Sequence, residues 1–224
     1  MSIDRHRVFI SYYHAEDQKY KDNLIRMSEF DYSKGRYVSI FEDCSVREKE
    51  IDDSNGQLSA ESIRRIIRDS YMRNATVLVL LCGANTQGRK HVDWEIHTAM
   101  YHSDINPQMG ILVVNLPSIS QCCRAGENFE KELLAPNSRW TSFTTRKEYE
   151  DAYPYMPSRI IDNFVAGIDD KSITPISVVD WSRIENNPVI LKELIHNAYN
   201  RGKNLNYHYD HSTLLRRNNS PLKE

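Results

Sequence analysis

Runs of apolar residues alternate along the chain with longer segments in which apolar positions recur every three or four residues. Two runs, 75–82 (ATVLVLLC) and 109–116 (MGILVVNL), are apolar on both faces, which is typical of central strands in a parallel sheet. Shorter runs at 7–12, 36–43 and 174–181 are rich in β-branched and aromatic residues. The pattern predicts five strands.

The segments between these runs have helical character. Ser59 is suited to cap one helix, Pro188 fits the first turn of another, and Asn55-Gly56 marks a turn in the polar stretch 44–57. Helices are predicted over 15–30, 58–72, 88–100, 158–168 and 187–204. The last of them has an apolar face made by Val189, Leu191, Leu194, Ile195 and Ala198.

Strands that alternate with helices predict an α/β fold with three layers. The expected arrangement is a flavodoxin-like, five-stranded parallel sheet in the order 2-1-3-4-5. We expect one domain over 1–224, with a core at about 6–204, a tail at about 205–224 and an elaborated region, 117–172, before strand five. Ligands of such sheets bind outside the carboxyl ends of the strands, where the strand order reverses. The flanking loops here are 11–14 and 82–90.

Composition narrows the function classes. The 224 residues carry a formal net charge of −2, which gives no electrostatic reason to expect a nucleic acid partner. No apolar run approaches the roughly 20 residues that span a bilayer, and the start of the chain has no signal-peptide core. The four cysteines form no C-x-x-C pair. We therefore expect a cytoplasmic protein with no membrane partner, disulfide framework or metal site.

The carboxylate of Glu95 is expected in the first turn of the helix at 88–100, at the border of a face made by Val92, Ile96, Ala99 and Met100. Asp93 is expected on the outward side. Two interpretations of Glu95 stay open. It stabilises the helix dipole, which is the commoner role of a first-turn glutamate, or it faces a ligand at the predicted crevice.

Two blocks of sequence resemble a known family. HRVFISYYHAEDQKYKDNL (6–24) is similar to the first strand and acidic helix start of a TIR domain. TVLVLLCGANTQGRKHVDWEIHTAM (76–100) resembles the third strand, loop and glutamate-bearing helix of that fold. The spacing is most like the TIR-like branch of the Thoeris anti-phage defence protein ThsB, which VVDWSRIENNPVILKELIHNAY (178–199) also resembles.

The resemblance implies that NAD is a consumed substrate rather than a cofactor, and that Glu95 is the catalytic residue. His91 stands where many bacterial enzymatic TIR domains have tryptophan, and it could stack on a base or hydrogen-bond a ribose. Across the crevice, Phe9, Ser11, Tyr12, Tyr13 and His14 would form the opposite wall, with core packing of Phe9 and turn capping by Ser11 as the alternatives. Asn85 and Arg89 could bind the diphosphate or be ordinary solvated loop residues.

The implied function is an enzyme that cleaves NAD at the nicotinamide–ribose bond and makes a cyclic ADP-ribose-type signal for a separate effector, in response to a phage-derived trigger. One alternative is a non-catalytic module that assembles with other TIR domains, with contacts through the polar loop 42–58. Another is a nucleotide hydrolase or ribosyltransferase that acts on a nucleoside.

Overall fold

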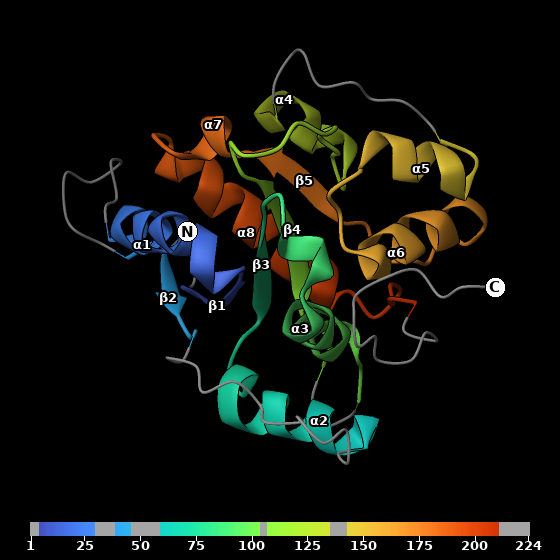
Figure 1. Ribbon diagram of the computed structural model, residues 1–224, viewed down its shortest axis with the longest axis horizontal. Helices are drawn as coiled ribbons and strands as arrows, with labels where there is room; N and C mark the ends of the chain where they lie inside the picture. Colours follow the sequence, from blue (N-terminus) through green and yellow to red (C-terminus); the bar gives the residue numbers. More distant parts are fainter. Residues whose placement is uncertain (1–4, 30–38, 46–58, 104–106, 135–142, 211–224) are drawn as a thin grey trace.

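The computed structural model describes residues 5–29, 39–45, 59–103, 107–134 and 143–210. Within them the chain forms a five-stranded parallel sheet in the order β2-β1-β3-β4-β5 (Figure 1). The strands are β1 (His6–Ser11), β2 (Phe41–Asp43), β3 (Val77–Cys82), β4 (Gly110–Asn115) and β5 (Ser177–Asp180). The predicted fold class and strand order are confirmed.

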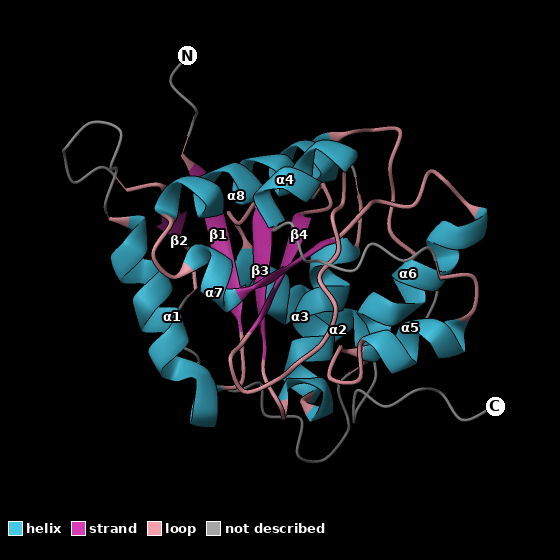
Figure 2. Ribbon diagram, turned by 90° about the horizontal axis from the view of Figure 1, so that it is seen from above, coloured by secondary structure: helices cyan, strands magenta, loops and turns pink. Residues whose placement is uncertain are grey.

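Alternate residues of the strands enter two separate hydrophobic clusters, because successive side chains of a strand point to opposite faces. On β3, Leu78 and Leu80 belong to one cluster, and Val77, Val79 and Leu81 to the other. All six residues of β3 and of β4 are buried, as expected for strands covered on both sides. The sheet is the middle layer of three (Figure 2).

Helices cover both faces of the sheet. The cluster that contains Leu78 also receives side chains from η1, α3, α5 and α6, and the cluster that contains Val79 receives them from α1, α4, α7 and α8. The helices are α1 (His14–Ser28), α2 (Ala60–Ile66), α3 (Lys90–Met100), α4 (Lys131–Leu134), α5 (Arg146–Ala152), α6 (Ser158–Asp169), α7 (Trp181–Ile184) and α8 (Pro188–Lys203). A π-helical segment, η1 (Ile67–Met72), continues α2, and two 3-10 turns are η2 (Thr86–Gly88) and η3 (Asn128–Glu130).

The starts of α2 and α8 follow the expected capping chemistry. The hydroxyl of Ser59 accepts a hydrogen bond from the backbone N–H of Ser62 at 3.1 Å. The side chain of Asn187 accepts one from Ile190 at 3.3 Å, and Pro188 occupies the first helical position of α8. The predicted cap at Ser59 and the place of Pro188 are confirmed.

Some predicted boundaries and faces are wrong. Among the described residues of the predicted strand 36–43 only the last three pair, as β2, and the Asn55-Gly56 turn lies outside the described residues. The predicted strand 174–181 is shorter, because Trp181 already begins α7. Val189 is 52% exposed, so it does not belong to the buried face of α8, whereas the other four predicted residues are buried.

A buried polar network attaches the elaborated region to the sheet. Glu130 accepts a hydrogen bond from Arg201 of α8 at 2.6 Å and one from the hydroxyl of Ser177 of β5 at 2.5 Å. Arg201 also donates to Ser177 at 2.8 Å. All three side chains are buried, and these hydrogen bonds link the two charges of the ion pair away from water.

Helix α8 packs unusually close to β4. A Cβ atom placed on Gly110 would lie 2.0 Å from the carbonyl oxygen of Ala198, and one placed on Gly202 would lie 2.3 Å from the backbone nitrogen of Gly110. The two backbones therefore touch directly, and only glycine leaves room for this approach.

The packed chain continues past residue 204, the expected boundary of the tail. The backbone of His208 pairs with residues 172–174, and Asn163 of α6 holds Asp210 through two hydrogen bonds of 2.8 and 3.0 Å. Between these contacts Tyr209 is 1% exposed and joins the α3–α6 cluster. A buried aromatic side chain explains why this polar segment is held on the fold.

Candidate functional site at the carboxyl ends of β1 and β3

The alternation of β1 directs Ser11 toward α3. Ser11 has the same parity as Phe9, whose ring packs in the cluster that contains α3. The Ser11 hydroxyl donates a hydrogen bond to Oε2 of Glu95 at 2.5 Å, and the contact is buried. Two residues 84 positions apart in sequence are thus joined where β1 ends.

Glu95 is not in the first turn of its helix, so that expectation is wrong. The chain makes the short turn η2 and then an extended N-cap residue, Arg89, so α3 starts only at Lys90. Glu95 is the sixth residue of α3 and 7% exposed. Because the effect of the helix dipole is concentrated in the first turn, the dipole interpretation loses most of its basis.

A line of rings runs from the end of β1 to the start of α3. The ring of Tyr12 stacks on that of His14 with centroids 4.3 Å apart, and His14 meets His91 edge-on at 5.9 Å. His91 precedes Glu95 by one helical turn. Tyr12 itself is buried, and its hydroxyl donates to Gln18 at 2.5 Å, so it supports the ring of His14 from the core.

The loop after β3 is fastened to the start of α1. The amide of Asn85 donates to both carboxylate oxygens of Glu16, at 2.9 and 3.0 Å. The guanidinium carbon of Arg89 lies 3.7 Å from the ring centroid of Tyr13, a close cation–π contact. The two predicted diphosphate ligands are therefore near the site but engaged with protein side chains.

Seven of the nine predicted site residues lie at the carboxyl ends of β1 and β3 or in α3 and are not part of the hydrophobic core: Ser11, Tyr13, His14, Asn85, Arg89, His91 and Glu95. The other two, Phe9 and Tyr12, are core residues, with Phe9 fully buried. Core packing, the alternative interpretation of Phe9, describes its position in the structure.

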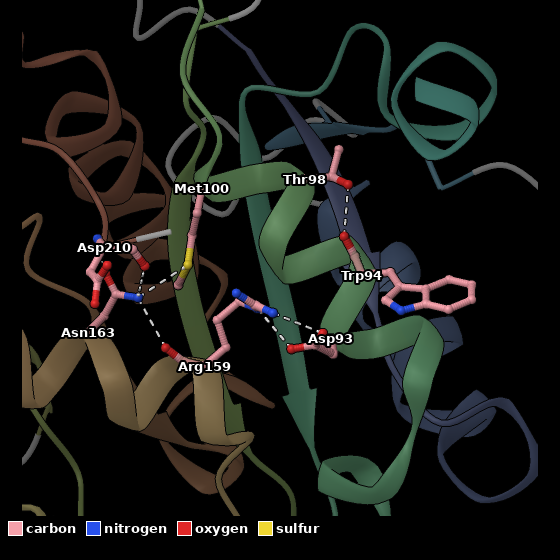
Figure 3. A network of polar contacts seen from close by, with 7 residues as sticks. All are labelled: Asp93, Trp94, Thr98, Met100, Arg159, Asn163 and Asp210. Atoms are coloured by element: carbon pink, nitrogen blue, oxygen red, sulfur yellow. Dashed lines mark hydrogen bonds and ion pairs between the residues drawn. The ribbon is translucent and has the colours of Figure 1, made fainter. Parts of the chain in front are cut away.

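Asp93 is fully buried, so its expected outward position is wrong. Arg159 of α6 donates to its two carboxylate oxygens at 2.8 and 3.0 Å. Figure 3 shows Asp93 pointing to Arg159 while Trp94 leaves α3 on another side. Every residue from Val92 to Met100 is buried, because α3 packs against α2, η1, β3 and α6 at once. A helix enclosed in this way has no outward face at these positions.

Three residues of the region were not predicted. They are Asp17 of α1, Thr86 and Gly83. Asp17 is 4% exposed and Thr86 is fully buried, and both contact Gly83, which directly follows β3. Helical spacing could have found Asp17, because it shares a stripe with three other buried residues of α1: Lys21, Leu24 and Ser28.

The comparison with known families concerns this region. The family model described as Thoeris protein ThsB, TIR-like domain, matches residues 9–121, which is 113 of 224 residues and includes both Ser11 and Glu95. The chain belongs to this family. No match was found among curated proteins.

Membership in the Thoeris TIR-like family supports a role in anti-phage defence. The matched range extends from the end of β1 past β4, so it contains every residue of the candidate site in this TIR-like domain. Within the residues that the structure describes, no helix has both the length and the apolar character needed to cross a membrane. The same part of the chain contains no group of three or more His, Cys, Asp or Glu side chains arranged to hold a metal ion.

Proposed function

We propose that this TIR-like domain cleaves NAD at the nicotinamide–ribose bond, with Glu95 as the catalytic residue, and makes a cyclic ADP-ribose-type signal in anti-phage defence. The observation that carries the proposal is the buried hydrogen bond from Ser11 to the Glu95 carboxylate. It fixes an acidic group at the place where parallel sheets of this topology bind ligands.

Cleavage of this bond depends on stabilisation by a negative charge rather than on protonation by a general acid. Nicotinamide leaves as a neutral molecule from a cationic precursor, so the departing nitrogen needs no proton, and the ribose passes through an oxocarbenium-like state. A fixed carboxylate stabilises that cation. The Ser11 hydroxyl is a neutral donor, so it orients Glu95 without cancelling its charge.

The surrounding side chains suggest how the substrate would lie. The rings of Tyr13, His14 and His91 are half-buried and could stack on nicotinamide or adenine. Asn85 and Arg89 would bind the diphosphate after exchanging their contacts with Glu16 and Tyr13. Phe9 and Tyr12 would support these groups from the core.

The outcome of the reaction depends on which group captures the ribosyl cation. A site that excludes water favours capture by a group of the same molecule, which gives a cyclic product. Such a product would activate a separate effector. The trigger would come from the phage, and assembly with other TIR-like domains would complete the site.

Glu95→Gln tests the proposal. Glutamine keeps the shape of the side chain and an acceptor for Ser11 but removes the charge, so nicotinamide release should fall by about 10²–10³-fold with little change in the thermal melt. Ser11→Ala should reduce release by about tenfold or more, since a hydrogen bond to a charged group contributes about 1.5–3 kcal/mol. Release and cyclic products are measured by mass spectrometry in cells that express each variant during phage infection.

The matched control is Glu193→Gln. Glu193 is exposed on α8, on the other face of the sheet, and its substitution should leave nicotinamide release unchanged. If Glu95→Gln retained both product formation and protection against phage, catalysis by Glu95 would be refuted. Protection without any nicotinamide release by the parent protein would instead favour the non-catalytic assembly module.

A further inference from the structure

Asp17 places a buried carboxylate against the backbone that follows β3. It is the fourth residue of α1 and 4% exposed. A Cβ atom placed on Gly83 would lie 2.7 Å from Oδ2 of Asp17, so the carboxylate occupies the space that any other residue at position 83 would fill. This acid has no part in the proposed cleavage of NAD, and its burial calls for another role.

Thr86 joins Asp17 to the turn. Its hydroxyl accepts a hydrogen bond from the backbone N–H of Gly83 at 2.9 Å and also contacts the Asp17 carboxylate. The carbonyl oxygen of Leu81 lies 3.3 Å from the same hydroxyl. A hydroxyl has one proton, so it can donate to Asp17 or to Leu81 but not fully to both. An ionised Asp17 can only accept this proton, whereas a protonated Asp17 can itself donate to the Thr86 oxygen and leave the hydroxyl proton for Leu81.

The 83–89 loop, defined as residues 83–89, is held at three places on α1 and on its N-cap residue, Tyr13. Asp17 holds its interior through Thr86, and the pairs Glu16–Asn85 and Tyr13–Arg89 hold its surface. Of these three contacts only the one between Asp17 and Thr86 joins two buried side chains. Opening the loop would therefore expose the Asp17 carboxylate to water.

We propose that Asp17 is a positioning residue whose protonation controls the opening of the 83–89 loop. The loop carries Asn85 and Arg89, so its opening would regulate access of the substrate. That consequence rests on the proposed function, whereas the link between protonation of Asp17 and opening of the loop does not.

The charges around Asp17 give the direction of the effect. Burial raises the pKa of Asp17 from its ordinary value of 3.8 to about 6, and the neighbouring charge of Glu16 adds to the rise, while Lys19 and the hydrogen bond from Thr86 oppose it. Cys82, at the end of β3, is close enough to interact electrostatically with this carboxylate, but burial raises the pKa of its thiol to about 12, so it stays neutral. Arg89 of the loop is directed onto the ring of Tyr13.

An opened loop exposes Asp17 to water and returns its pKa to the ordinary value. Opening is then linked to loss of the proton, so the opening equilibrium should rise about tenfold per pH unit between about pH 4 and pH 6. Above pH 6 the carboxylate is ionised in both states, and the equilibrium should level off. At neutral pH the loop should open about a hundredfold more often than at pH 4.

Amide hydrogen exchange followed by NMR tests this without NAD. The amides of Gly83, Thr86 and Arg89 are hydrogen-bonded within the loop, so their protection factors report its opening. In the parent protein we expect these factors to fall about tenfold per pH unit from pH 4 to 6. In Asp17→Asn they should be flat. Asp22→Asn, the same change at an exposed position of α1, should keep the slope.

Core amides of β3 and β4 separate local from global opening. If the loop amides were as strongly protected as those of Leu80 and Val113, opening would be global and the proposal would be overturned. A flat profile in the parent protein, or the same slope in Asp17→Asn, would overturn it as well. Should Asp17→Asn not fold, carbon-13 titration of the Asp17 carboxyl in the parent protein decides: a midpoint near 6 supports the link, and a midpoint below about 4.5 refutes it.

Discussion

Asp93 and Glu95 are two residues apart on α3, and their carboxylates have different surroundings. Asp93 faces Arg159 in a fully buried ion pair, where each charge neutralises the other. Glu95 is oriented by the neutral hydroxyl of Ser11 at the end of β1. The first arrangement suits a structural role, and the neutral donor at Glu95 is compatible with stabilisation of a cation.

Asp93→Asn should strongly destabilise the fold. The substitution leaves the guanidinium of Arg159 buried without its counter-charge, which typically costs about 3–5 kcal/mol. Asp151→Asn is the matched control, because Asp151 pairs with Lys147 at the surface, where such pairs contribute at most about 1 kcal/mol. Free energies of unfolding from urea titrations provide the comparison. A loss below about 1 kcal/mol for Asp93→Asn would show that the buried pair does not stabilise α3.

At the scale of elements, the contact between α8 and β4 depends on two glycines. Gly202→Ala should destabilise the protein by about 1–3 kcal/mol, because the new methyl group would overlap the backbone of Gly110 and force the helix away from the sheet. Gly167→Ala is the control within another helix. The nearest atom to a Cβ there is 3.8 Å away, so the change should be neutral or stabilise by up to about 1 kcal/mol. Equal melting temperatures for the Gly202→Ala and Gly167→Ala variants would contradict the close contact.

Most elements could be predicted because their signals are local. The two-sided apolar runs of β3 and β4, and the Asn187–Pro188 start of α8, lie within the segments that they define. The surroundings of α3 could not be predicted in this way. Its apolar stripe indicates one buried face, whereas α2, η1 and α6 enclose the others. The partner of Asp93 lies 66 residues away in another helix, and the periodicity of neither helix shows that the two side chains meet.

Only part of the candidate site could likewise be predicted from the sequence. Ser11 and Glu95 could be named because each stands in a block that resembles the family, and strand parity alone directs Ser11 to α3. Their mutual hydrogen bond, and the contact of Asp17 with Gly83 and Thr86, depend on how elements meet across the sheet. No periodicity within one segment encodes such a meeting.

At the scale of the whole molecule, the segment after α8 completes the core. Tyr209→Ala should lower the free energy of unfolding by about 3 kcal/mol or more, because a fully buried aromatic side chain would leave a cavity among α3, α6 and the sheet. Leu205→Ala serves as the control, since Leu205 is 90% exposed and its change should stay within about 0.5 kcal/mol. Equal stability of the two variants in urea would show that the segment is dispensable.

The burial of Tyr209 also sets an order of events during translation. Ribosomes add about 5–20 residues per second, and domains fold as their chain emerges. Ser11 and Glu95 are synthesised before Tyr209, which joins the hydrophobic cluster beneath α3 and follows Glu95 by more than a hundred residues. For several seconds after Glu95 is added, its carboxylate should therefore lie beside an incomplete hydrophobic cluster, and only the arrival of Tyr209 gives it a rigid support.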